Sequence, residues 1–381
     1  MTYSIEQAKE QIIRAGKELL DAGLIARTWG NISARISATQ FLVTPSGRAY
    51  DSLKPEDIVL VNIADGKVPK GAETIKPSSE KGVHAAVYRQ RPGVNFVIHT
   101  HQDYATAISI LGRQFRLKNV KPEAKKVLGP FIPTARYALS STKALESHVI
   151  TSIRKYPQAK SVLLRNHGTV CMGADYEDAF AIARTLEEIC RMKYEQLIGS
   201  DGLQDQTGSE ADQNRVFDRV LRREIHEEYD EHYRAFENGK THFLIETSTP
   251  CIVRAASYGR DIKAYVDDLA QIAGTVIRCL PEDASEQAIA KALGLGACGA
   301  VLIRGKGAIC AGGTEEDAEA VAILLEKGCM AALLAQKVKA GSDDIPDSWK
   351  AKGVPKTGGK IEHIVYTQKY SKLKDQGEET C

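Results

Sequence analysis

The sequence predicts an α/β protein in two parts, the second of which is a partial copy of the first. Short strands separated by turn residues follow one N-terminal helix, a pattern typical of an antiparallel meander. Further helices then alternate with apolar strands up to about residue 199. A total of 381 residues is enough for two domains with cores of their own.

Composition narrows the classes of function. The chain has 51 Lys and Arg and 49 Asp and Glu, a formal net charge of +2, so nothing indicates a nucleic acid or an anionic membrane as partner. Small-molecule chemistry is favoured. We expect a cytoplasmic protein, because no leader and no apolar run of about 18 residues occurs. The eight cysteines lack CxxC spacing, which predicts free thiols in a reducing compartment.

Capping and turn signals define the N-terminal elements. Residues 4–24 predict a helix, because Ser4 and Gln7 can form a capping box and Gly23 lies where a helix stops. Three strands are expected next, at residues 31–36, 40–44 and 57–63. Asp65-Gly66 after the third strand predicts a hairpin turn.

Later helices and strands alternate. Helices are expected at residues 79–90, 104–111, 141–154 and 175–199, and buried strands at 94–101 and 161–168. Glu80 lies in the first turn of its helix, where the dipole favours a carboxylate and lowers its pKa. A surface role that satisfies this dipole is therefore one interpretation of Glu80.

Two histidines end the strand at 94–101. Side chains on a strand alternate faces, so His99 and His101 project from one side, roughly 6 to 7 Å apart along the chain, within reach of one metal ion. A lone histidine at a strand end is more often a hydrogen-bonded residue than a ligand, and the pair makes a metal ligand an equal alternative. His167 ends the second buried strand, and Gly168 behind it allows a tight turn and close backbone approach.

Together these residues suggest a catalytic metal site. His99, His101 and His167 offer three imidazole ligands, and Glu80 is a candidate fourth group. Three histidines with an exchangeable fourth position are typical of catalytic rather than structural zinc. Such an ion can polarise a carbonyl and hold an enediolate while a carboxylate moves protons. Mn²⁺, Co²⁺ and Fe²⁺ suit the same ligands.

Three segments of glycine and small polar residues separate the early elements, at residues 28–31, 44–47 and 76–80. Turn chemistry alone can explain each of them. If the segments cluster, their backbone N–H groups and serine hydroxyls can bind a phosphate without lysine or arginine. A sugar phosphate could then bind to both the ion and the loops.

The chain repeats part of itself. Residues 300–310 align without a gap with residues 161–171, and the match continues through 316–318 against 177–179. Roughly half of about thirty positions are identical, which indicates duplication. Residues 250–280 are a looser copy of 104–138. The second copy has Lys306 in place of His167 and nothing like His-Thr-His, so we expect it to lack a metal site.

These observations predict the division of the chain. We expect a catalytic domain at residues 1–200, a linker at 201–214, a degenerate repeat without a metal site at 215–340, and a C-terminal arm or tail at 341–381. Glycine, aspartate, serine and glutamine dominate the linker, a composition typical of flexible connections.

Six motifs in this order resemble the class II aldolase/adducin family, and within it the fuculose-phosphate aldolase branch. They are Thr28-Trp29-Gly30-Asn31-Ile32-Ser33, Thr44-Pro45-Ser46-Gly47, Leu53-Lys54-Pro55-Glu56-Asp57, Lys76-Pro77-Ser78-Ser79-Glu80, His99-Thr100-His101 and Asn166-His167-Gly168. The resemblance covers about residues 4–199. It implies a three-layer α/β/α class II aldolase-like domain with a central, mainly antiparallel sheet, followed here by the partial degenerate repeat. It also implies a tetramer with active sites between subunits.

The resemblance assigns roles to the motif residues. It implies that His99, His101 and His167 bind zinc, and that Glu80 is the fourth ligand at rest and the acid/base during turnover. The residues that match phosphate-binding positions are Gly30, Asn31, Ser46, Gly47, Ser78 and Ser79. The family's proton-donating tyrosine is missing from residues 113–130, and Tyr137 beyond that loop is a stand-in for it.

The expected function is therefore a metal-dependent aldolase that cleaves a sugar phosphate by retro-aldol chemistry through a zinc-bound enediolate. A pentulose-phosphate 4-epimerase or a 3-oxo-acid-phosphate decarboxylase could use the same site, although the epimerases usually carry aspartate in place of Glu80. A non-catalytic adducin-like scaffold is a remote alternative, because such members lack the histidines. We expect a homo-oligomer with sites near subunit or repeat interfaces, and smaller than the usual ring because the second copy replaces some subunits.

Overall fold

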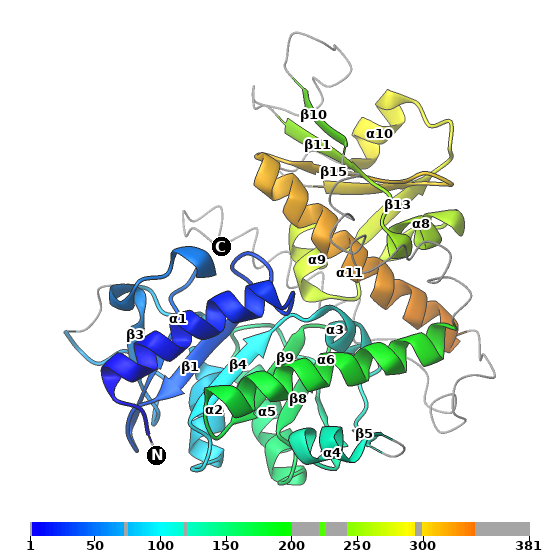
Figure 1. Cartoon of the computed structure of the whole chain (residues 1–381). Coiled ribbons are helices and arrows are strands. Elements are labelled where there is room, and N and C mark those ends of the chain that lie inside the picture. The colour runs from blue at the N-terminus through cyan, green and yellow to red at the C-terminus, as the bar shows by residue number, and fades with distance from the viewer. Residues whose placement is uncertain are drawn as a thin grey trace. The chain divides into compact units, whose positions relative to one another are not determined.

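The computed structural model describes residues 2–71, 75–117, 120–199, 221–225, 242–293 and 299–339. The chain forms two units that divide between Lys193 and Tyr194, and Figure 1 labels their elements. The expected linker at 201–214 and the expected tail at 341–381 lie outside the described residues. No helix in the described ranges is long and apolar enough to cross a membrane.

A seven-stranded sheet forms the centre of the first unit, in the order β3-β2-β1-β4-β9-β8-β7. The strands are β1 (Asn31–Arg35), β2 (Gln40–Val43), β3 (Val59–Asn62), β4 (Phe96–Thr100), β7 (Thr134–Ala135), β8 (Ser161–Leu164) and β9 (Gly168–Gly173). Neighbours run antiparallel except for β7 and β8, which are parallel. The expected central, mainly antiparallel sheet is therefore confirmed.

Helices cover both faces of this sheet, which makes three layers (Figure 1). They are α1 (Ile5–Asp21), α2 (Lys81–Gln90), α3 (Asp103–Ser109), α4 (Pro122–Leu128), α5 (Lys143–Lys155) and α6 (Tyr176–Ile198). Helices α2 and α5 pack together on one face, whereas α1 and α3 contact the sheet on the other. Shorter elements are η1 (Tyr50–Ser52), η2 (Pro55–Asp57) and the small ribbon of β5 (Phe115–Arg116) and β6 (Phe131–Ile132).

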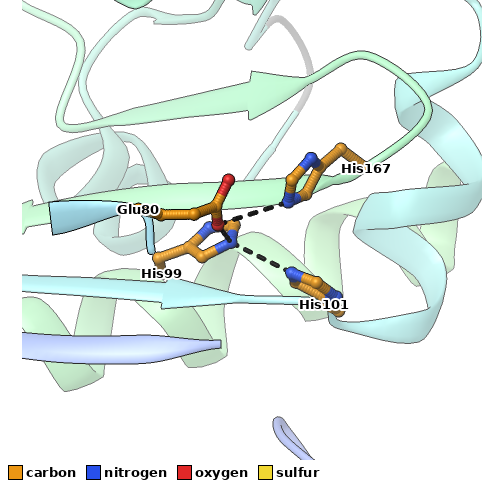
Figure 2. A group of neighbouring side chains, drawn as sticks. All are labelled: Glu80, His99, His101 and His167. Carbon is orange, nitrogen blue, oxygen red and sulfur yellow. Dashed lines mark hydrogen bonds and ion pairs between the residues drawn. The ribbon is translucent and has the colours of Figure 1, made fainter. Parts of the chain in front are cut away.

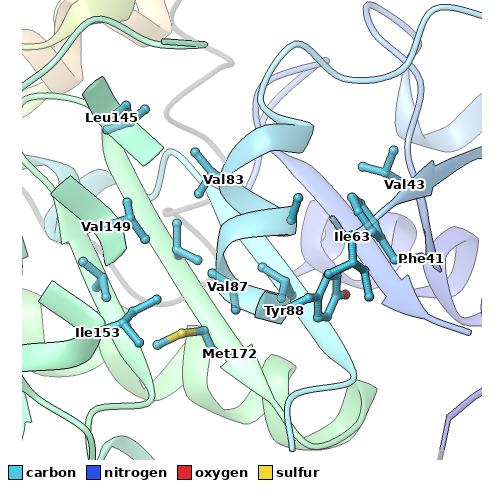
Figure 3. Close-up of a cluster of buried hydrophobic side chains, with 14 of the residues drawn as sticks. Phe41, Val43, Ile63, Val83, Val87, Tyr88, Leu145, Val149, Ile153 and Met172 are labelled. Carbon is cyan, nitrogen blue, oxygen red and sulfur yellow. The ribbon is translucent and has the colours of Figure 1, made fainter. Parts of the chain in front are cut away.

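The core between the sheet and α2 and α5 determines which way the first histidine faces. Val97 on β4 belongs to this core with Val83 and Val87 of α2 (Figure 3). Phe96, its neighbour on β4, packs instead against the Tyr176 ring, with a centroid separation of 5.6 Å. Since strand side chains alternate, His99 continues the row of Val97. It therefore emerges on the α2 side, where that helix begins.

Local signals account for the start and end of α1. Ser4 Oγ accepts a hydrogen bond from the Gln7 N–H, and Gln7 Oε1 accepts one from the Ser4 N–H, which completes the predicted capping box. Such reciprocal bonds satisfy donors that the first turn of a helix leaves unpaired. Gly23 has a φ of +66° just beyond the end of the helix, a conformation that glycine adopts without a steric penalty.

Two details of the sequence prediction were wrong. The hairpin expected at Asp65-Gly66 is only a turn. The Gly66 N–H donates to Asn62 O and the Asn62 N–H donates to Lys67 O, but the next strand in the described residues is β4, which does not pair with β3 at the edge of the sheet. The strand expected to reach His167 ends at Leu164, and His167 lies in the turn to β9. The short apolar segment of β9 and the helix α4 within a lysine-rich stretch were not predicted.

The second unit contains a six-stranded sheet in the order β10-β11-β15-β14-β13-β12. Its strands are β10 (Leu221–Ile225), β11 (His242–Thr247), β12 (Ile262–Lys263), β13 (Val276–Leu280), β14 (Gly299–Ile303) and β15 (Gly307–Gly312). Its helices are α8 (Pro250–Ser257), α9 (Asp267–Ala273), α10 (Glu286–Leu293) and α11 (Glu315–Lys339). The hairpin β14–β15 followed by α11 matches β8–β9 followed by α6, and β13–β14 is parallel, as β7–β8 is.

A pair of matched carboxylates confirms the register of the repeat. Glu187 of α6 accepts hydrogen bonds from the N–H groups of Tyr104 and Ala105 at the start of α3. Glu326 of α11 accepts equivalent bonds from the first N–H groups of α8, those of Cys251 and Ile252. Each carboxylate therefore caps the positive end of a helix, and α8 is the counterpart of α3.

Candidate active site

Three histidines and one glutamate meet near the end of β4 (Figure 2). His99 lies on β4, and His101 is the first residue after that strand. His167 occupies the turn between β8 and β9, and Glu80 immediately precedes α2. Their ligand atoms all lie within 4.8 Å of one another. His101 is half-buried and the other three residues are buried. The structure thus brings together the four residues that the sequence singled out.

A hydrogen bond from Nδ1 sets the orientation of the His99 ring. His99 Nδ1 lies 2.7 Å from the carbonyl oxygen of Thr169. A carbonyl only accepts hydrogen bonds, so Nδ1 carries a hydrogen, and in the neutral ring Nε2 keeps its lone pair. This lone pair faces the cluster, with Glu80 Oε2 at 2.7 Å and His101 Nε2 at 3.0 Å. Metal-binding histidines are typically oriented by such a carbonyl.

The separations of the donor atoms fit one small divalent ion. Ligands at about 2.0 to 2.1 Å from a tetrahedral zinc stand ~3.3 Å from one another. The separation is 3.0 Å between His99 Nε2 and His101 Nε2, and 3.5 Å between His167 Nε2 and Glu80 Oε2. Three imidazoles with an exchangeable fourth position are also a donor set of catalytic zinc. The residues present therefore suit such an ion.

Glu80 does not have the surface role that its place in the helix allowed. It is the N-cap residue of α2, but its side chain makes no capping hydrogen bond and is only 7% exposed. Burial raises the pKa of Glu80, but the charges and hydrogen bonds of His167 and His99 outweigh burial and hold its pKa well below the ordinary value. The low pKa thus comes from the histidines, and the carboxylate is ionised at neutral pH.

Ser141 supports Glu80, although no motif in the sequence indicated this role. Its backbone N–H donates to Glu80 Oε1 over 3.3 Å. Ser141 has a φ of +62°, which is uncommon for a residue other than glycine and often marks a functional site. A helix was expected to begin there, but Thr142 caps α5, accepting the Leu145 N–H on its hydroxyl.

Two of the three polar segments run side by side. The Ser46 N–H donates to Lys76 O over 2.9 Å, and the Ser78 N–H donates to Thr44 O over 3.0 Å. Ser78 Oγ also accepts the Glu80 N–H, which ties this loop to the start of α2. Ser78 is buried, Ser46 is half-buried, and Gly47 and Ser79 are exposed. These segments therefore gather next to Glu80.

The remaining polar segment lies against His99. Asn31 is the first residue of β1 and pairs with His99 of β4. Gly30 before it has a φ of +93°, and a Cβ added there would stand 2.5 Å from the carbonyl oxygen of His99. Only glycine permits this approach. The six residues expected at a phosphate site thus lie in three segments that adjoin Glu80 or His99, five of them in loops and Asn31 at the start of β1.

A buried hydrogen-bonded chain behind Asn31 was missed at the sequence level. His84 Nε2 lies 2.5 Å from Asn31 Oδ1, and His84 Nδ1 lies 2.6 Å from Ser33 Oγ. Ser33 Oγ is also 2.8 Å from the Tyr88 hydroxyl. Burial lowers the pKa of His84 to about 3, so this ring is neutral. His84 follows Glu80 by four residues, the spacing of one helix face, and this spacing could have revealed it.

Tyr137, the stand-in for the missing tyrosine, is half-buried. It lies between β7 and α5, in the segment that also supplies Ser141. Its catalytic role remains a prediction.

The second copy has other residues at the three histidine positions. Glu246 pairs with Ile309 across β11 and β15 as His99 pairs with Val170 across β4 and β9. Ser248 and Lys306 occupy the positions of His101 and His167, and all three replacements are exposed. Over the described ranges, the only group of side chains suited to a metal is that of Glu80 and the three histidines.

A candidate divalent-metal centre beside polar loops, on a three-layer α/β/α unit, is thus the defining feature of the chain. The sequence profile of the Class II Aldolase and Adducin N-terminal domain matches residues 10–194 and, a second time, residues 211–333. The chain belongs to this family. The double match also agrees with the duplication found in the sequence and in the two sheets.

Known relatives match about half of the chain. The 5-deoxy-D-ribulose 1-phosphate aldolase of Bacillus thuringiensis serovar kurstaki is 33% identical over 196 residues, which cover 50% of this chain and 86% of that one. The L-fuculose phosphate aldolase of Methanocaldococcus jannaschii is 33% identical over 184 residues, covering 48% and 94%. Among solved structures, an L-fuculose 1-phosphate aldolase is 29% identical, covers 50% and 86%, and has a TM-score of 0.45. By family, the chain is a class II aldolase-type carbon–carbon lyase.

Proposed function

We propose that the first unit is a metal-dependent aldolase that cleaves a ketose 1-phosphate by a retro-aldol reaction. The convergence of three histidines and Glu80 carries this proposal. The names of two relatives support the substrate class, since both describe aldolases of phosphorylated sugars. A sugar phosphate also suits a site in which an ion and N–H-rich loops lie together.

The ion, which we take to be zinc, would be held by His99, His101 and His167. Glu80 would be the fourth ligand in the enzyme without substrate. When bound, the ion supplies a Lewis acid that polarises the substrate carbonyl and stabilises an enediolate. The carbonyl of Thr169 keeps the His99 lone pair on the cluster side. Mn²⁺, Co²⁺ or Fe²⁺ would suit the same donors.

The role of Glu80 is proton transfer. Cleavage breaks the bond between C3 and C4 of the ketose: the C4 hydroxyl loses its proton as C4 becomes an aldehyde, and the electron pair stays on C3. A carboxylate can accept the first proton and return it to C3, so the reaction balances without another reactant. The Ser141 N–H holds one Glu80 oxygen, and Oε2 faces the histidines. Tyr137 is the candidate residue for a hydrogen bond to the oxygen on C4.

The phosphate would bind to the loops formed by Gly30, Asn31, Ser46, Gly47, Ser78 and Ser79. The serine hydroxyls and the N–H groups of Gly47 and Ser79 would offer donors beside the first turn of α2, and a helix N-terminus favours an anion. The contact between residues 44–46 and 76–78 uses the N–H groups of Ser46 and Ser78, and it supports the proposal because it brings the two loops together.

Mass-spectrometric product analysis tests this function. The metal-replete protein is incubated with ketose 1-phosphates, pentulose 5-phosphates and 3-oxo-acid phosphates. A three-carbon keto phosphate and an aldehyde are expected from a ketose 1-phosphate. An epimer or carbon dioxide would instead indicate one of the rival reactions, and no turnover of any compound would favour the scaffold. Glu80→Gln should lower turnover at least ~100-fold and keep the metal, whereas the exposed Glu56→Gln serves as the matched control.

We also propose a cytoplasmic homo-oligomer. The six cysteines within the described ranges are free, and five of them are buried, which suits a reducing compartment. Burial raises the pKa of Cys171 to about 12, so this thiol is unreactive. Light scattering tests the proposed smaller assembly: a mass below four full chains is expected, and a mass of four full chains would contradict it.

A further inference from the structure

The second unit contains a pocket of about 530 Å³. Its walls come from α8 and the turn that follows, from the C-terminal part of α11, and from the last residue of α6. Helices α8 and α11 lie side by side (Figure 1). Three of the lining residues are cationic, namely Arg254, Arg260 and Lys337, and none of the lining residues within the described ranges is acidic. The pocket therefore concentrates positive charge.

The repeat shows which residues the first copy has at these positions. The matched pairs are Ala107 and Arg254, Leu111 and Tyr258, Leu197 and Gln336, and Ile198 and Lys337. All four residues of the first copy are buried and apolar. Every one of these positions is more polar in the second copy, and two of them gained a positive charge. Loss of a metal site alone does not account for this change, because none of the positions corresponds to a metal ligand.

Arg254 is the most informative residue of the pocket. Its Nη1 atom is buried and has no hydrogen-bond partner among the residues that the structure describes. A buried N–H donor on a cation is unfavourable without an acceptor, and such a group calls for an explanation. A negative charge in the pocket would compensate the charge of this guanidinium group.

We propose that this pocket binds a small organic anion with more than one phosphate or carboxylate group. Arg254, Arg260 and Lys337 would neutralise its charges through charge-assisted hydrogen bonds. The volume is in the range of pockets that take small metabolites. Ile198 and the Tyr258 ring would contact the carbon skeleton. Ile198 lies beyond the boundary between Lys193 and Tyr194, so all residues of the pocket belong to the second unit. The proposal is therefore independent of the function proposed for the first unit.

Equilibrium binding of citrate and of fructose 1,6-bisphosphate to the full chain tests the proposal. Arg254→Ala and Lys337→Ile each restore the residue of the first copy, and each should weaken binding at least about tenfold by removing one charged hydrogen bond. The exposed Lys291→Ala on α10 is the matched control and should bind as the unchanged protein does. A bisphosphate bound in the first unit would be retained by both variants. Comparing the affinity for citrate with that for the bisphosphate shows whether the pocket prefers carboxylate or phosphate groups.

Thermal unfolding without any anion gives a second result. Arg254→Ala should unfold at an unchanged or higher temperature, because it removes an unpartnered buried donor and a like-charge repulsion. An arginine that only supports the fold would lower the unfolding temperature when replaced. Failure of both probes to bind the unchanged protein at about 1 mM, or equal binding by both variants, would overturn the proposal.

Discussion

His84 and Asn31 form a short buried hydrogen bond, with His84 Nε2 2.5 Å from Asn31 Oδ1. An amide oxygen only accepts, so His84 Nε2 carries the hydrogen and Nδ1 accepts from the Ser33 hydroxyl. Tyr88 then donates to Ser33, whose oxygen is 2.8 Å away. This chain fixes the Asn31 oxygen on the side of α2 and leaves its amide nitrogen as the donor for a ligand.

Replacing His84 should therefore weaken phosphate recognition more than it slows the chemistry. For His84→Ala we expect the KM of a phosphorylated substrate to rise about tenfold, the value of one lost hydrogen bond, while kcat changes little and metal content does not change. The control is His148→Ala, at a half-buried histidine of α5 that lies outside this hydrogen-bonded chain. A fall in kcat with an unchanged KM would contradict the positioning role of His84.

His84 should also make stability depend on pH. Its pKa is about 3 in the folded protein, whereas the unfolded chain takes up this proton near pH 6.5. The neutral ring therefore makes its full contribution to the free energy of unfolding above about pH 6.5. This contribution decreases as the pH falls toward 3, by up to ~1.4 kcal/mol per pH unit.

Urea unfolding of the metal-free protein between about pH 7 and pH 5 measures this dependence. His84→Gln should lose stability with falling pH less steeply than the unchanged protein does, and the difference should correspond to one proton. Equal slopes for the two proteins would show that His84 is protonated in the folded state.

Gly30 should be intolerant of any side chain. Gly30→Ala adds a Cβ at 2.5 Å from the His99 carbonyl at a φ of +93°, and we expect a loss of ~3 kcal/mol or more, with weaker metal binding because β4 must shift. Gly23→Ala is the matched control: it has a φ of +66° with nothing within 4 Å, and should cost only ~1 kcal/mol. Equal losses in the two variants would refute the crowding at His99.

The parts of the site that sequence predicts are those with a short-range pattern. The spacing of His99 and His101 follows from strand alternation, and self-similarity over thirty positions revealed the second copy. Ser141 and Thr169 could not be found in this way, because their contributions are a backbone N–H and a carbonyl oxygen, 61 and 70 residues from the side chains they contact. Every residue has these two groups, so no residue type marks them.

Glu80 illustrates a different difficulty. Its position before α2 suits the helix dipole, and this local effect alone could explain a carboxylate there. Burial among histidines from two distant segments overrides it. The hairpin expected at Asp65-Gly66 failed for a similar reason, because turn residues determine a turn but cannot supply a partner strand.

Metal analysis tests the central claim most directly. The purified, metal-replete protein should contain one divalent ion per chain rather than two, since the second copy has Glu246, Ser248 and Lys306 at the histidine positions. His167→Ala should lose most of this ion, and His148→Ala should retain it. An unchanged protein that binds no divalent ion, or a His167→Ala variant that keeps one ion per chain, would contradict the three-histidine site.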